Sequence, residues 1–465
     1  MHFRVGRTAI LYLLLVALFA PAAHAATPVF GIPTKVTPTL GFGYEPGIVI
    51  DRYGNIFATA HKENWQLAAA PDANSPTYAR SMSWAWTSVD GGKSFVDIPG
   101  LTAASLEQHE FGDEGDMAFD DAGHLYFVDT NVTDVSFTRW SVTGAGLANM
   151  KLDFTRQLLP AAQEVDDRPW IIAHGNGEVF YFGNQGDKVT YPLGMGSGSG
   201  FGPGRYTVYA SHDGGQTFDP FGYTLKDSGW CRPAADHAPG SHYVYAVCTN
   251  DGGSDDVASP VNANGTLWAY VSSNEGKSFE RYKVGDYKAL DSTTSWPTVV
   301  VGPGGDLWAL YVDAGTLVET TDALGTSYDP SNNRLVLYHS ADHGKTWTHQ
   351  DITPLKQRGR YEYAWIALSP DGKSLGIGVY SRPDNNSPWR VYGGIWKPGQ
   401  RVVLVSLDDD HPVSSADHFD APADFMSSYF NPDGTLSVVW TKYELTDPTG
   451  SAALARDIYH ARSIP

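Results

Sequence analysis

The chain has 465 residues and a formal net charge of −20, from 52 acidic and 32 basic side chains. Such an acidic surface repels the phosphates of nucleic acids and anionic lipids, so we exclude both as expected partners. Aromatic residues make up 13% of the chain, beside 49 Gly and 29 Pro residues, and this composition favours many short strands joined by tight turns.

Residues 1–25 have the pattern of a secretory signal peptide. Arg4 and Arg7 precede an apolar run that ends at the small-residue site Ala23-His24-Ala25. The run is short for a membrane anchor, and no later segment has enough consecutive apolar residues to span a bilayer. We therefore expect cleavage after Ala25, a secreted or periplasmic protein without a membrane span, and a single domain over residues 26–465.

Seven segments after residue 26 repeat one pattern: a short apolar strand, a turn that contains Gly, and a second apolar strand. The first is GIVIDRYGNIFATA and the last is FMSSYFNPDGTLSVVW. The turn glycines are Gly54, Gly123, Gly177, Gly240, Gly304, Gly372 and Gly434. They recur about every 63 residues, a length that suits one four-stranded antiparallel sheet per repeat. We predict an all-β fold, a β-propeller of seven blades, with six as the alternative if one hairpin is an elaboration.

A second repeat follows four of these hairpins at a nearly constant offset. Its copies, called here the repeated turns, are SVDGGKSF (88–95), SHDGGQTF (211–218), SSNEGKSF (272–279) and SADHGKTW (340–347). Each begins roughly 32 to 36 residues after a turn glycine, which places it between the third and fourth strands of a blade. The second blade lacks a copy, because the first two copies are separated by about two blade lengths.

The acid position of the repeated turns is occupied by Asp90, Asp213, Asn274 and Asp342. An Asp side chain accepts hydrogen bonds from nearby backbone N–H groups, and Gly supplies the positive φ that a tight turn requires. Asn274 can make the same turn hydrogen bonds but cannot act as an acid or a base. We therefore interpret these four residues as structural.

The repeated turns resemble the Asp-box, or bacterial neuraminidase repeat, S-x-D-x-G-x-[ST]-[WF], of sialidase-like β-propellers. This resemblance covers essentially all of the chain after the signal peptide, and it implies that the ligand site lies on the face opposite the Asp-boxes. The resemblance does not identify the reaction, and our first hypothesis is a secreted, glycan-processing glycoside hydrolase of sialidase-like type. The alternative is a non-catalytic propeller that binds a glycan or a protein, because the same repeat occurs in such proteins.

The two ends of the chain are expected to close the ring. DIYHARS (457–463) is the third strand of the last repeat, and no fourth strand follows it. The segment VFGIPTKVT (29–37) is available to pair with it. Sialidases of this type carry an R-I-P motif near the start, whereas this segment has Gly where Arg belongs.

Candidate site residues lie in segments that enter a first strand or leave a second strand, because antiparallel order places the turn glycines and the repeated turns together on the other face. Acids, arginines and aromatic residues are mixed there, as in a carbohydrate site. The catalytic candidates are Glu114, Asp116, Tyr361 and Glu362. The substrate-binding candidates are Asp167, Arg168, Arg232, Trp296 and Asp313.

Two mechanisms are open for these candidates. Most glycosidases use a pair of carboxyl groups, whereas sialidases use a tyrosine nucleophile activated by a carboxylate, a role that the resemblance gives to Tyr361 and Glu362. Neighbours in a strand point to opposite faces, which opposes that pairing. Arg168 and Arg232 enter adjacent blades, where they can pair with a substrate carboxylate.

Cys231 and Cys248 are placed symmetrically about the hairpin at Pro239-Gly240. We expect a disulfide between the first two strands of the fourth blade, with free thiols as the alternative. No cofactor is expected, and no cysteine and histidine cluster indicates zinc. The acidic segment FGDEGDMAFDD (111–121) leaves calcium as an alternative to ordinary turn acids.

Overall fold

The computed structural model describes residues 27–37, 42–62, 83–102, 114–130, 135–158, 166–185, 205–250, 264–288, 296–314, 319–322, 325–328, 333–355, 359–384, 386–414, 425–444 and 455–465. The predicted signal peptide lies outside this set. Within it, the only helix is the 3₁₀ helix η2 (Leu147–Asn149), and no helix is long and apolar enough to cross a membrane.

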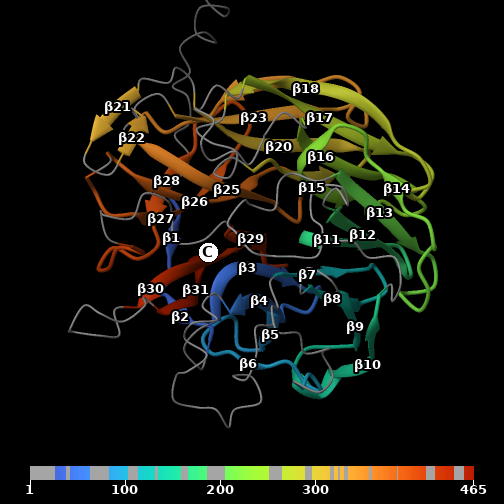
Figure 1. Cartoon of the computed structure of the whole chain (residues 1–465). Helices are drawn as coiled ribbons and strands as arrows, with labels where there is room; N and C mark the ends of the chain where they lie inside the picture. Colours follow the sequence, from blue (N-terminus) through green and yellow to red (C-terminus); the bar gives the residue numbers. More distant parts are fainter. Residues whose placement is uncertain are drawn as a thin grey trace, which may run out of the picture.

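Seven antiparallel sheets surround a central axis and form a seven-bladed β-propeller, which confirms the predicted fold (Figure 1). In each blade the first strand lies nearest the axis. Blade 1 contains β3 (Phe42–Ile50), β4 (Ile56–Lys62), β5 (Ser83–Ser88) and β6 (Val96–Asp97). Blade 2 contains β7 (Glu114–Phe119), β8 (His124–Thr130), β9 (Val135–Val142) and β10 (Met150–Gln157). Blade 3 contains β11 (Asp166–His174), β12 (Glu178–Gln185), β13 (Arg205–Ser211) and β14 (Tyr223–Thr224).

Blades 4 to 6 continue the same order, and blade 5 carries an additional hairpin. Blade 4 contains β15 (Ser228–Ala235), β16 (Val244–Asn250), β17 (Asn264–Ser272) and β18 (Glu280–Lys288). Blade 5 contains β19 (Thr298–Gly302), β20 (Asp306–Asp313), β23 (Arg334–Ser340) and β24 (Thr348–Asp351), with the additional hairpin β21 (Glu319–Asp322) and β22 (Gly325–Tyr328). Blade 6 contains β25 (Arg360–Leu368), β26 (Leu375–Arg382), β27 (Arg390–Trp396) and β28 (Val403–Ser406).

Blade 7 joins the two ends of the chain, as predicted. It contains β29 (Ser427–Phe430), β30 (Leu436–Glu444), β31 (Ala455–Ile464), β1 (Val29–Phe30) and β2 (Thr34–Lys35). Val29 pairs with Ile464 and Thr34 with His460, so the N-terminal segment supplies the outer strand of the last blade. The hydrogen bonds of this blade therefore hold the ring closed.

One face of the ring, the turn face, carries the hairpin turns between first and second strands. All seven predicted turn glycines have positive φ, from 70° at Gly372 to 98° at Gly123. A residue with a Cβ adopts such a backbone only at a cost in free energy, which explains why Gly recurs there. The opposite face, where the first strands begin, is called the entry face.

The repeated turns lie on the turn face and make the expected hydrogen bonds. Asp213 Oδ1 accepts from the Thr217 amide at 2.8 Å, and its Oδ2 accepts from Thr217 Oγ1 at 2.7 Å. Asn274 keeps this pattern, because its Oδ1 accepts from the Ser278 amide at 3.1 Å while its Nδ2 donates to Ser278 Oγ at 2.9 Å. The amide thus replaces the carboxylate within an unchanged turn.

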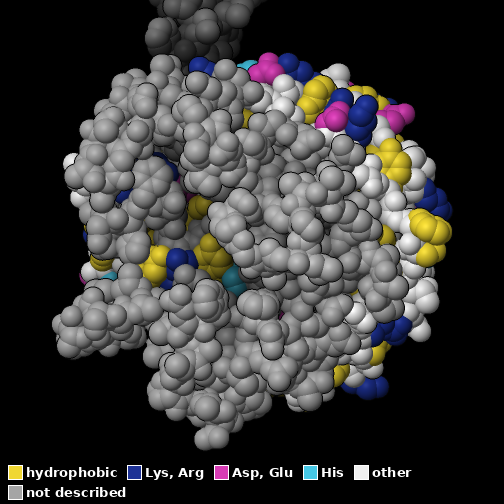
Figure 2. All heavy atoms as spheres, viewed as in Figure 1, with side chains coloured by type: hydrophobic (Ala, Val, Ile, Leu, Met, Phe, Trp, Pro, Cys, Tyr) yellow, Lys and Arg dark blue, Asp and Glu magenta, His cyan; other side chains and the backbone are white. Residues whose placement is uncertain are grey.

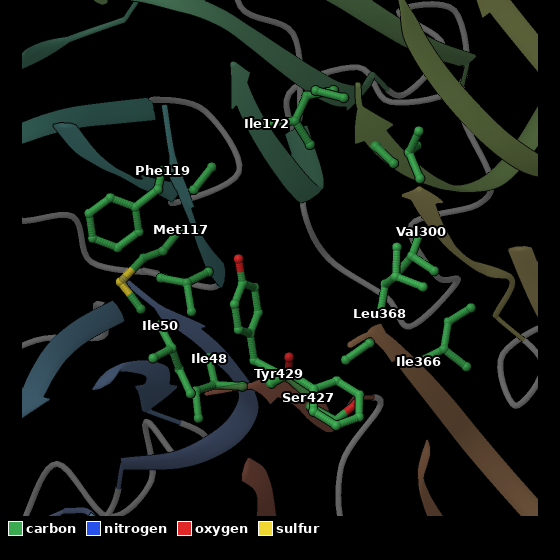
Figure 3. A pocket seen from close by; sticks show the side chains of 18 of the residues that line it. Ile48, Ile50, Met117, Phe119, Ile172, Val300, Ile366, Leu368, Ser427 and Tyr429 are labelled. Atoms are coloured by element: carbon green, nitrogen blue, oxygen red, sulfur yellow. The ribbon is translucent and has the colours of Figure 1, made fainter. Parts of the chain in front are cut away.

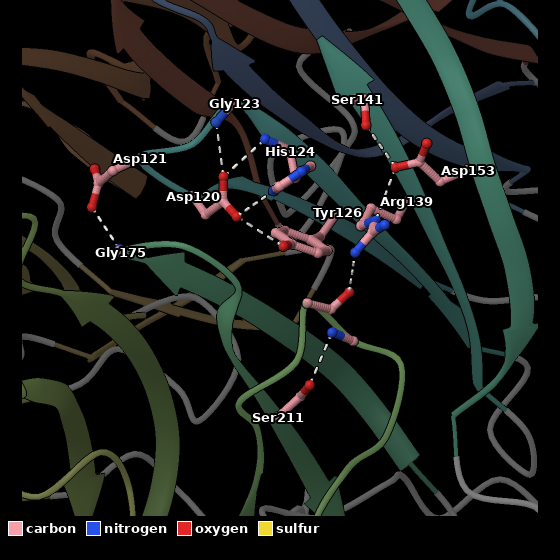
Figure 4. A network of polar contacts seen from close by, with 12 residues as sticks. Asp120, Asp121, Gly123, His124, Tyr126, Arg139, Ser141, Asp153, Gly175 and Ser211 are labelled. Atoms are coloured by element: carbon pink, nitrogen blue, oxygen red, sulfur yellow. Dashed lines mark hydrogen bonds and ion pairs between the residues drawn. The ribbon is translucent and has the colours of Figure 1, made fainter.

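Blade 2 has no repeated turn, as predicted, and η2 occupies the connection between β9 and β10. A different acid organises the turn face of this blade (Figure 4). Asp120 Oδ1 accepts from the amides of Gly123 and His124, each at 2.8 Å, and its Oδ2 accepts from the Tyr126 hydroxyl at 2.9 Å. Turn acids on this face therefore serve the scaffold in more than one sequence context.

Buried side chains fill the spaces between neighbouring blades. Gly215 of the second repeated turn shows how close this packing is, since a Cβ there would lie 2.0 Å from Phe137 Cε1 of blade 2. Blade 4 also contains the predicted disulfide, in which Cys231 on β15 faces Cys248 on β16. Interblade packing and chain-end pairing together fix the ring that positions the site.

Candidate functional site

A channel of about 490 Å³ follows the axis of the ring and is lined by the first strands (Figure 3). Its wall is mostly apolar, with Ile48, Met117 and Ile172 among its residues, and the Tyr429 hydroxyl points into it. Burial raises the pKa of Tyr429, although 39% of its surface is accessible from the channel. Asp51, Arg52 and His237 line the channel toward the turn face, and Arg232 lines it toward the entry face. All residues named here as lining the channel or the pocket below belong to the described part of the chain.

Arg232 forms the centre of a layer at the entry end of the channel. Its guanidinium lies 4.2 Å from the ring centre of Trp170 and 4.6 Å from that of Trp365. Its Nη1 donates to Asp116 Oδ2 at 3.2 Å, which joins β15 of blade 4 to β7 of blade 2. Cation–π contact with two rings and an ion pair with a buried acid fix the arginine in one position.

Further aromatic rings complete this layer. Trp296, which precedes β19, lies 4.5 Å from the ring of Trp230 and 4.8 Å from that of Phe425. Its Nε1 donates to the Cys231 carbonyl at 3.0 Å. The rings of Trp170 and Phe425 meet at 5.2 Å, edge to face. The entry end of the channel therefore has an aromatic floor with one ion pair in it.

A small pocket of about 20 Å³ lies beside this layer, and two carboxylates line it, those of Glu45 and Asp116. Glu45 Oε2 lies 3.6 Å from His61 Nε2, and Tyr44 packs edge-on against His61. Glu45 and Asp116 are each 6% exposed. Two buried acids from adjacent blades thus share one pocket but have different basic neighbours.

Backbone irregularities give this region its shape. The register of the first strand shifts near the entry end in blades 1, 3, 4 and 6. Glu45 and Tyr363 adopt positive φ angles of 50° and 49° at two of these shifts. Bulges redirect side chains and are common beside active sites. In blade 1 the bulge interrupts the regular pleat of β3 and turns the Glu45 side chain toward the pocket.

The protonation of Asp116 is set by opposing influences. Burial raises its pKa, and Arg232 together with the Ile171 amide, which donates to Oδ2 at 3.1 Å, opposes the rise. The net effect is a pKa above the ordinary value for Asp. A carboxyl group in such surroundings is able to hold a proton at a higher pH than a solvated one.

The structure brings together some of the predicted site residues. Asp116, Arg232 and Trp296 lie in the entry-end layer described above. Tyr361 is 1% exposed and packs in the apolar cluster between blades 5 and 6, while Glu362 pairs with Arg360 at 2.5 Å. The two neighbours therefore have separate surroundings, as their adjacency in a strand predicts.

The remaining candidates lie elsewhere or are not fully described. Asp313 at the end of β20 pairs with Arg334 at 3.3 Å. Glu114 in β7 and Asp167 and Arg168 in β11 have side chains outside the described set. In the acidic segment 111–121, Asp121 accepts from the Gly175 amide at 2.6 Å, Asp120 from the amides of its own turn, and Asp116 from Arg232.

Glu45 and His61 lie in the entry and exit segments that the sequence assigns to this face, although they are not among the catalytic or substrate-binding candidates. The aromatic residues Trp170, Trp365 and Phe425 are additional members of the site that the sequence analysis does not name. One signal was available, because four of the seven first strands have a Trp within them or just before them, as Trp170, Trp230, Trp296 and Trp365. Viewed from the side of Figure 1, hydrophobic, basic and histidine side chains are visible together near the middle of the ring (Figure 2).

Comparisons with known proteins bear on the fold. No family model and no curated protein matches the chain. An α-L-arabinofuranosidase from Fusarium graminearum is 13% identical, with 94% of this chain and 98% of that chain covered and a TM-score of 0.46. A fungal alcohol oxidase of the AA5 family in complex with copper is 10% identical, with 95% and 77% covered and a TM-score of 0.50. The NanB sialidase from Streptococcus pneumoniae is 11% identical, with 97% and 72% covered and a TM-score of 0.43. At these identities the likeness concerns the propeller fold alone.

Proposed function

We propose that this protein is a glycoside hydrolase whose site lies at the entry end of the channel. The observation that carries the proposal is the pair of carboxylates, Glu45 and Asp116, that lines one pocket beside an aromatic floor. Glycosidic bonds are usually cleaved by two carboxyl groups, one that protonates the leaving oxygen and one that acts on the other side of the sugar.

The different surroundings of the two acids suggest their roles. We assign proton donation to Asp116, because burial favours its protonated form. Glu45, beside His61, takes the role of base or nucleophile. In the reaction Asp116 gives its proton to the oxygen of the departing group, and water finally supplies the hydroxyl of the released sugar and returns a proton to the pair.

The aromatic residues and Arg232 support this assignment. Flat rings such as those of Trp170 and Trp365 present apolar faces of the kind that ligand pockets commonly use, with a few polar groups to set orientation. Arg232 lies between these two rings and contacts Asp116, so we assign it a positioning role.

The sialidase-type version of this proposal uses Tyr361 as the nucleophile with Glu362 beside it. The resemblance of the repeated turns supports it, but the burial of Tyr361 in an interblade cluster favours the carboxylate pair. Tyr361→Phe distinguishes the two, because it preserves the packing and removes only the hydroxyl. We expect it to retain turnover.

A panel of chromogenic glycosides, sialosides included, tests the proposed activity. On the best substrate we expect Glu45→Gln and Asp116→Asn to lower kcat about 10² to 10⁴-fold, the usual contribution of acid–base groups. Sodium azide should restore turnover to Glu45→Gln by replacing the missing base or nucleophile. Full activity in both variants, measured below their melting temperatures, would overturn the assignment.

A second function, carbohydrate binding without turnover, is favoured by one observation. The pocket shared by the two acids has a volume of only about 20 Å³, and Arg232 already neutralises Asp116. A glycan array probed with the wild-type protein tests it. Binding that Trp365→Ala weakens, with no turnover of any glycoside in the panel, would establish the binding function in place of the enzyme.

We also propose that the protein is exported and matures by cleavage after Ala25. The N-terminal sequence pattern supports this, and so does the disulfide of blade 4, since disulfides persist mainly in oxidising compartments. Expression in a bacterium, followed by fractionation and N-terminal sequencing, should find the protein outside the cytoplasm with Ala26 first. A cytoplasmic protein that begins at Met1 would contradict the proposal.

A further inference from the structure

The turn face of blades 3 and 4 brings together three side chains that are well separated in the sequence. One ligand atom from each of Glu178, His212 and Glu275 lies within 4.8 Å of the other two. Glu178 and His212 belong to blade 3, and Glu275 belongs to the repeated turn of blade 4. The described residues contain no other group of this kind.

Strand register explains why these side chains meet. Val179 pairs with Ser211, so Glu178 and His212 are the next residues on the two adjacent strands. Phe180 lies two residues after Glu178 and therefore on the same side of the sheet. A Cβ on Gly276 would lie 3.1 Å from Phe180 Cδ1, which shows that this side of blade 3 faces the repeated turn of blade 4.

A buried histidine lies on the same side of blade 3. His174 is paired across the hairpin with Glu178, and its ring stacks on Phe180 at 5.6 Å with an angle of 8°. It is 3% exposed, and its Nε2 has no hydrogen-bond partner within the described part of the chain. A buried polar atom without a partner is costly, and here it belongs to the residue that is paired with Glu178 of the cluster.

Glu275 contributes its carboxylate from a strained position of the blade 4 repeated turn. It has a φ of 58°, at a position that Gly91 and Gly214 occupy in the first two copies and that His343, with a φ of 59°, occupies in the fourth. Glycine would adopt this backbone without cost, whereas a carboxylate-bearing residue is strained there.

Each of the two acids is hydrogen-bonded to a histidine. His212 Nδ1 lies 2.5 Å from Glu178 Oε2, and His242 Nδ1 lies 2.6 Å from Glu275 Oε1. Lys277 Nζ is 3.6 Å from Glu275 Oε2, but this side chain is 61% exposed and is able to move into solvent. Cation binding would require these side chains to exchange their hydrogen bonds for bonds to the ion.

We propose that Glu178, His212 and Glu275 bind a Zn²⁺ ion that bridges blades 3 and 4 on the turn face. Zinc accepts imidazole nitrogen and carboxylate oxygen at about 2.0 to 2.2 Å, and three protein ligands leave one position for water or for a nearby histidine. The imidazole disfavours Ca²⁺ and Mg²⁺, which take oxygen ligands. This site is independent of the proposed glycosidase chemistry on the other face.

Zinc titration of the untagged protein by isothermal calorimetry tests the proposal. We expect one ion per chain, and at least about a tenfold loss of affinity in His212→Ala and in Glu275→Gln, since even outer-shell changes at metal sites cost this much. His349→Ala is the matched control, because it removes an exposed histidine of blade 5 and should bind zinc as the wild type does.

Two further measurements distinguish zinc binding at this site from zinc binding elsewhere on the protein. Zinc should raise the Tm of the wild type and of His349→Ala but not of His212→Ala, because binding to the folded state stabilises it. Anomalous diffraction at the zinc edge should place the ion between blades 3 and 4. Equal affinity in wild type and His212→Ala, or an anomalous peak elsewhere, would overturn the proposal. Glycosidase activity enters neither readout.

Discussion

The two faces of the ring are built from different kinds of contact. On the turn face, Asp213 bonds to Thr217, four residues away, and the same pattern recurs in each repeated turn. On the entry face, Asp116 bonds to Arg232, which is 116 residues away and two blades distant. The side-chain bonds of each repeated turn are thus local, whereas the Asp116–Arg232 pair depends on the closed ring. Substitutions on the two faces should differ accordingly.

The largest stability effect is expected at Arg232. Arg232→Ala removes the ion-pair partner of the buried Asp116 carboxyl group and opens a gap between two Trp rings, so we expect a loss of about 3 to 5 kcal/mol. Lys283→Ala is the control, because Lys283 and Asp286 are 53% and 69% exposed, and it should cost at most about 1 kcal/mol. Urea denaturation measures both. Equal losses of unfolding free energy in the two variants would show that the Asp116–Arg232 pair contributes no more than an exposed ion pair.

The next largest effect is a difference in stability between alanine substitutions at two glycines of the turn face. Gly215→Ala combines a strained backbone at a φ of 78° with a clash against Phe137, and we expect about 2 to 5 kcal/mol of destabilisation. Gly54→Ala has a φ of 82° but nothing within 4 Å of the added Cβ, so it should cost only about 1 to 2 kcal/mol. Thermal unfolding compares the two, and the reverse order would contradict the packing seen at the repeated turn.

A smaller effect is expected at the turn acid itself. Asp213→Asn should cost less than about 1 kcal/mol, since Asn274 already maintains the same turn in blade 4, whereas Asp213→Ala removes every side-chain bond and should cost about 1 to 3 kcal/mol. Hydrolytic activity should be unchanged in Asp213→Asn. A large loss of activity in this variant, at full stability, would move the search for catalysis to the turn face.

The smallest expected effect is on thermal stability at low pH. Hydrogen bonds, chiefly from Thr346, lower the pKa of Asp342 to about 2, and those from Ser94 and Ser88 outweigh burial to lower that of Asp90 to about 2. Since the folded-state pKa values lie below the unfolded value of about 3.9, this stabilisation is present above about pH 4 and is lost as the pH falls through 2. The double variant Asp90→Asn, Asp342→Asn should therefore lose less Tm between pH 5 and pH 2 than the wild type. Parallel Tm curves would show that these acids do not contribute.

Much of the architecture could be predicted because its signals are local. Gly54 and the other turn glycines are required by backbone geometry, and Cys231 and Cys248 are symmetrical about a short hairpin, so their pairing follows from antiparallel register. The pocket gave no such signal. The bulge that turns Glu45 inward and the sandwich of Arg232 between Trp170 and Trp365 arise only where separate blades converge.

The sequence by itself determined the seven-bladed ring, its closure by the N-terminal segment and the structural role of the repeated aspartate, because each depends on contacts between residues close in the chain or on a regular repeat. Tertiary structure alone decided which acids share a pocket and which histidine approaches Glu178 and Glu275. Those groupings depend on the rotation of one blade relative to the next, and side-chain packing across whole sheets sets that rotation.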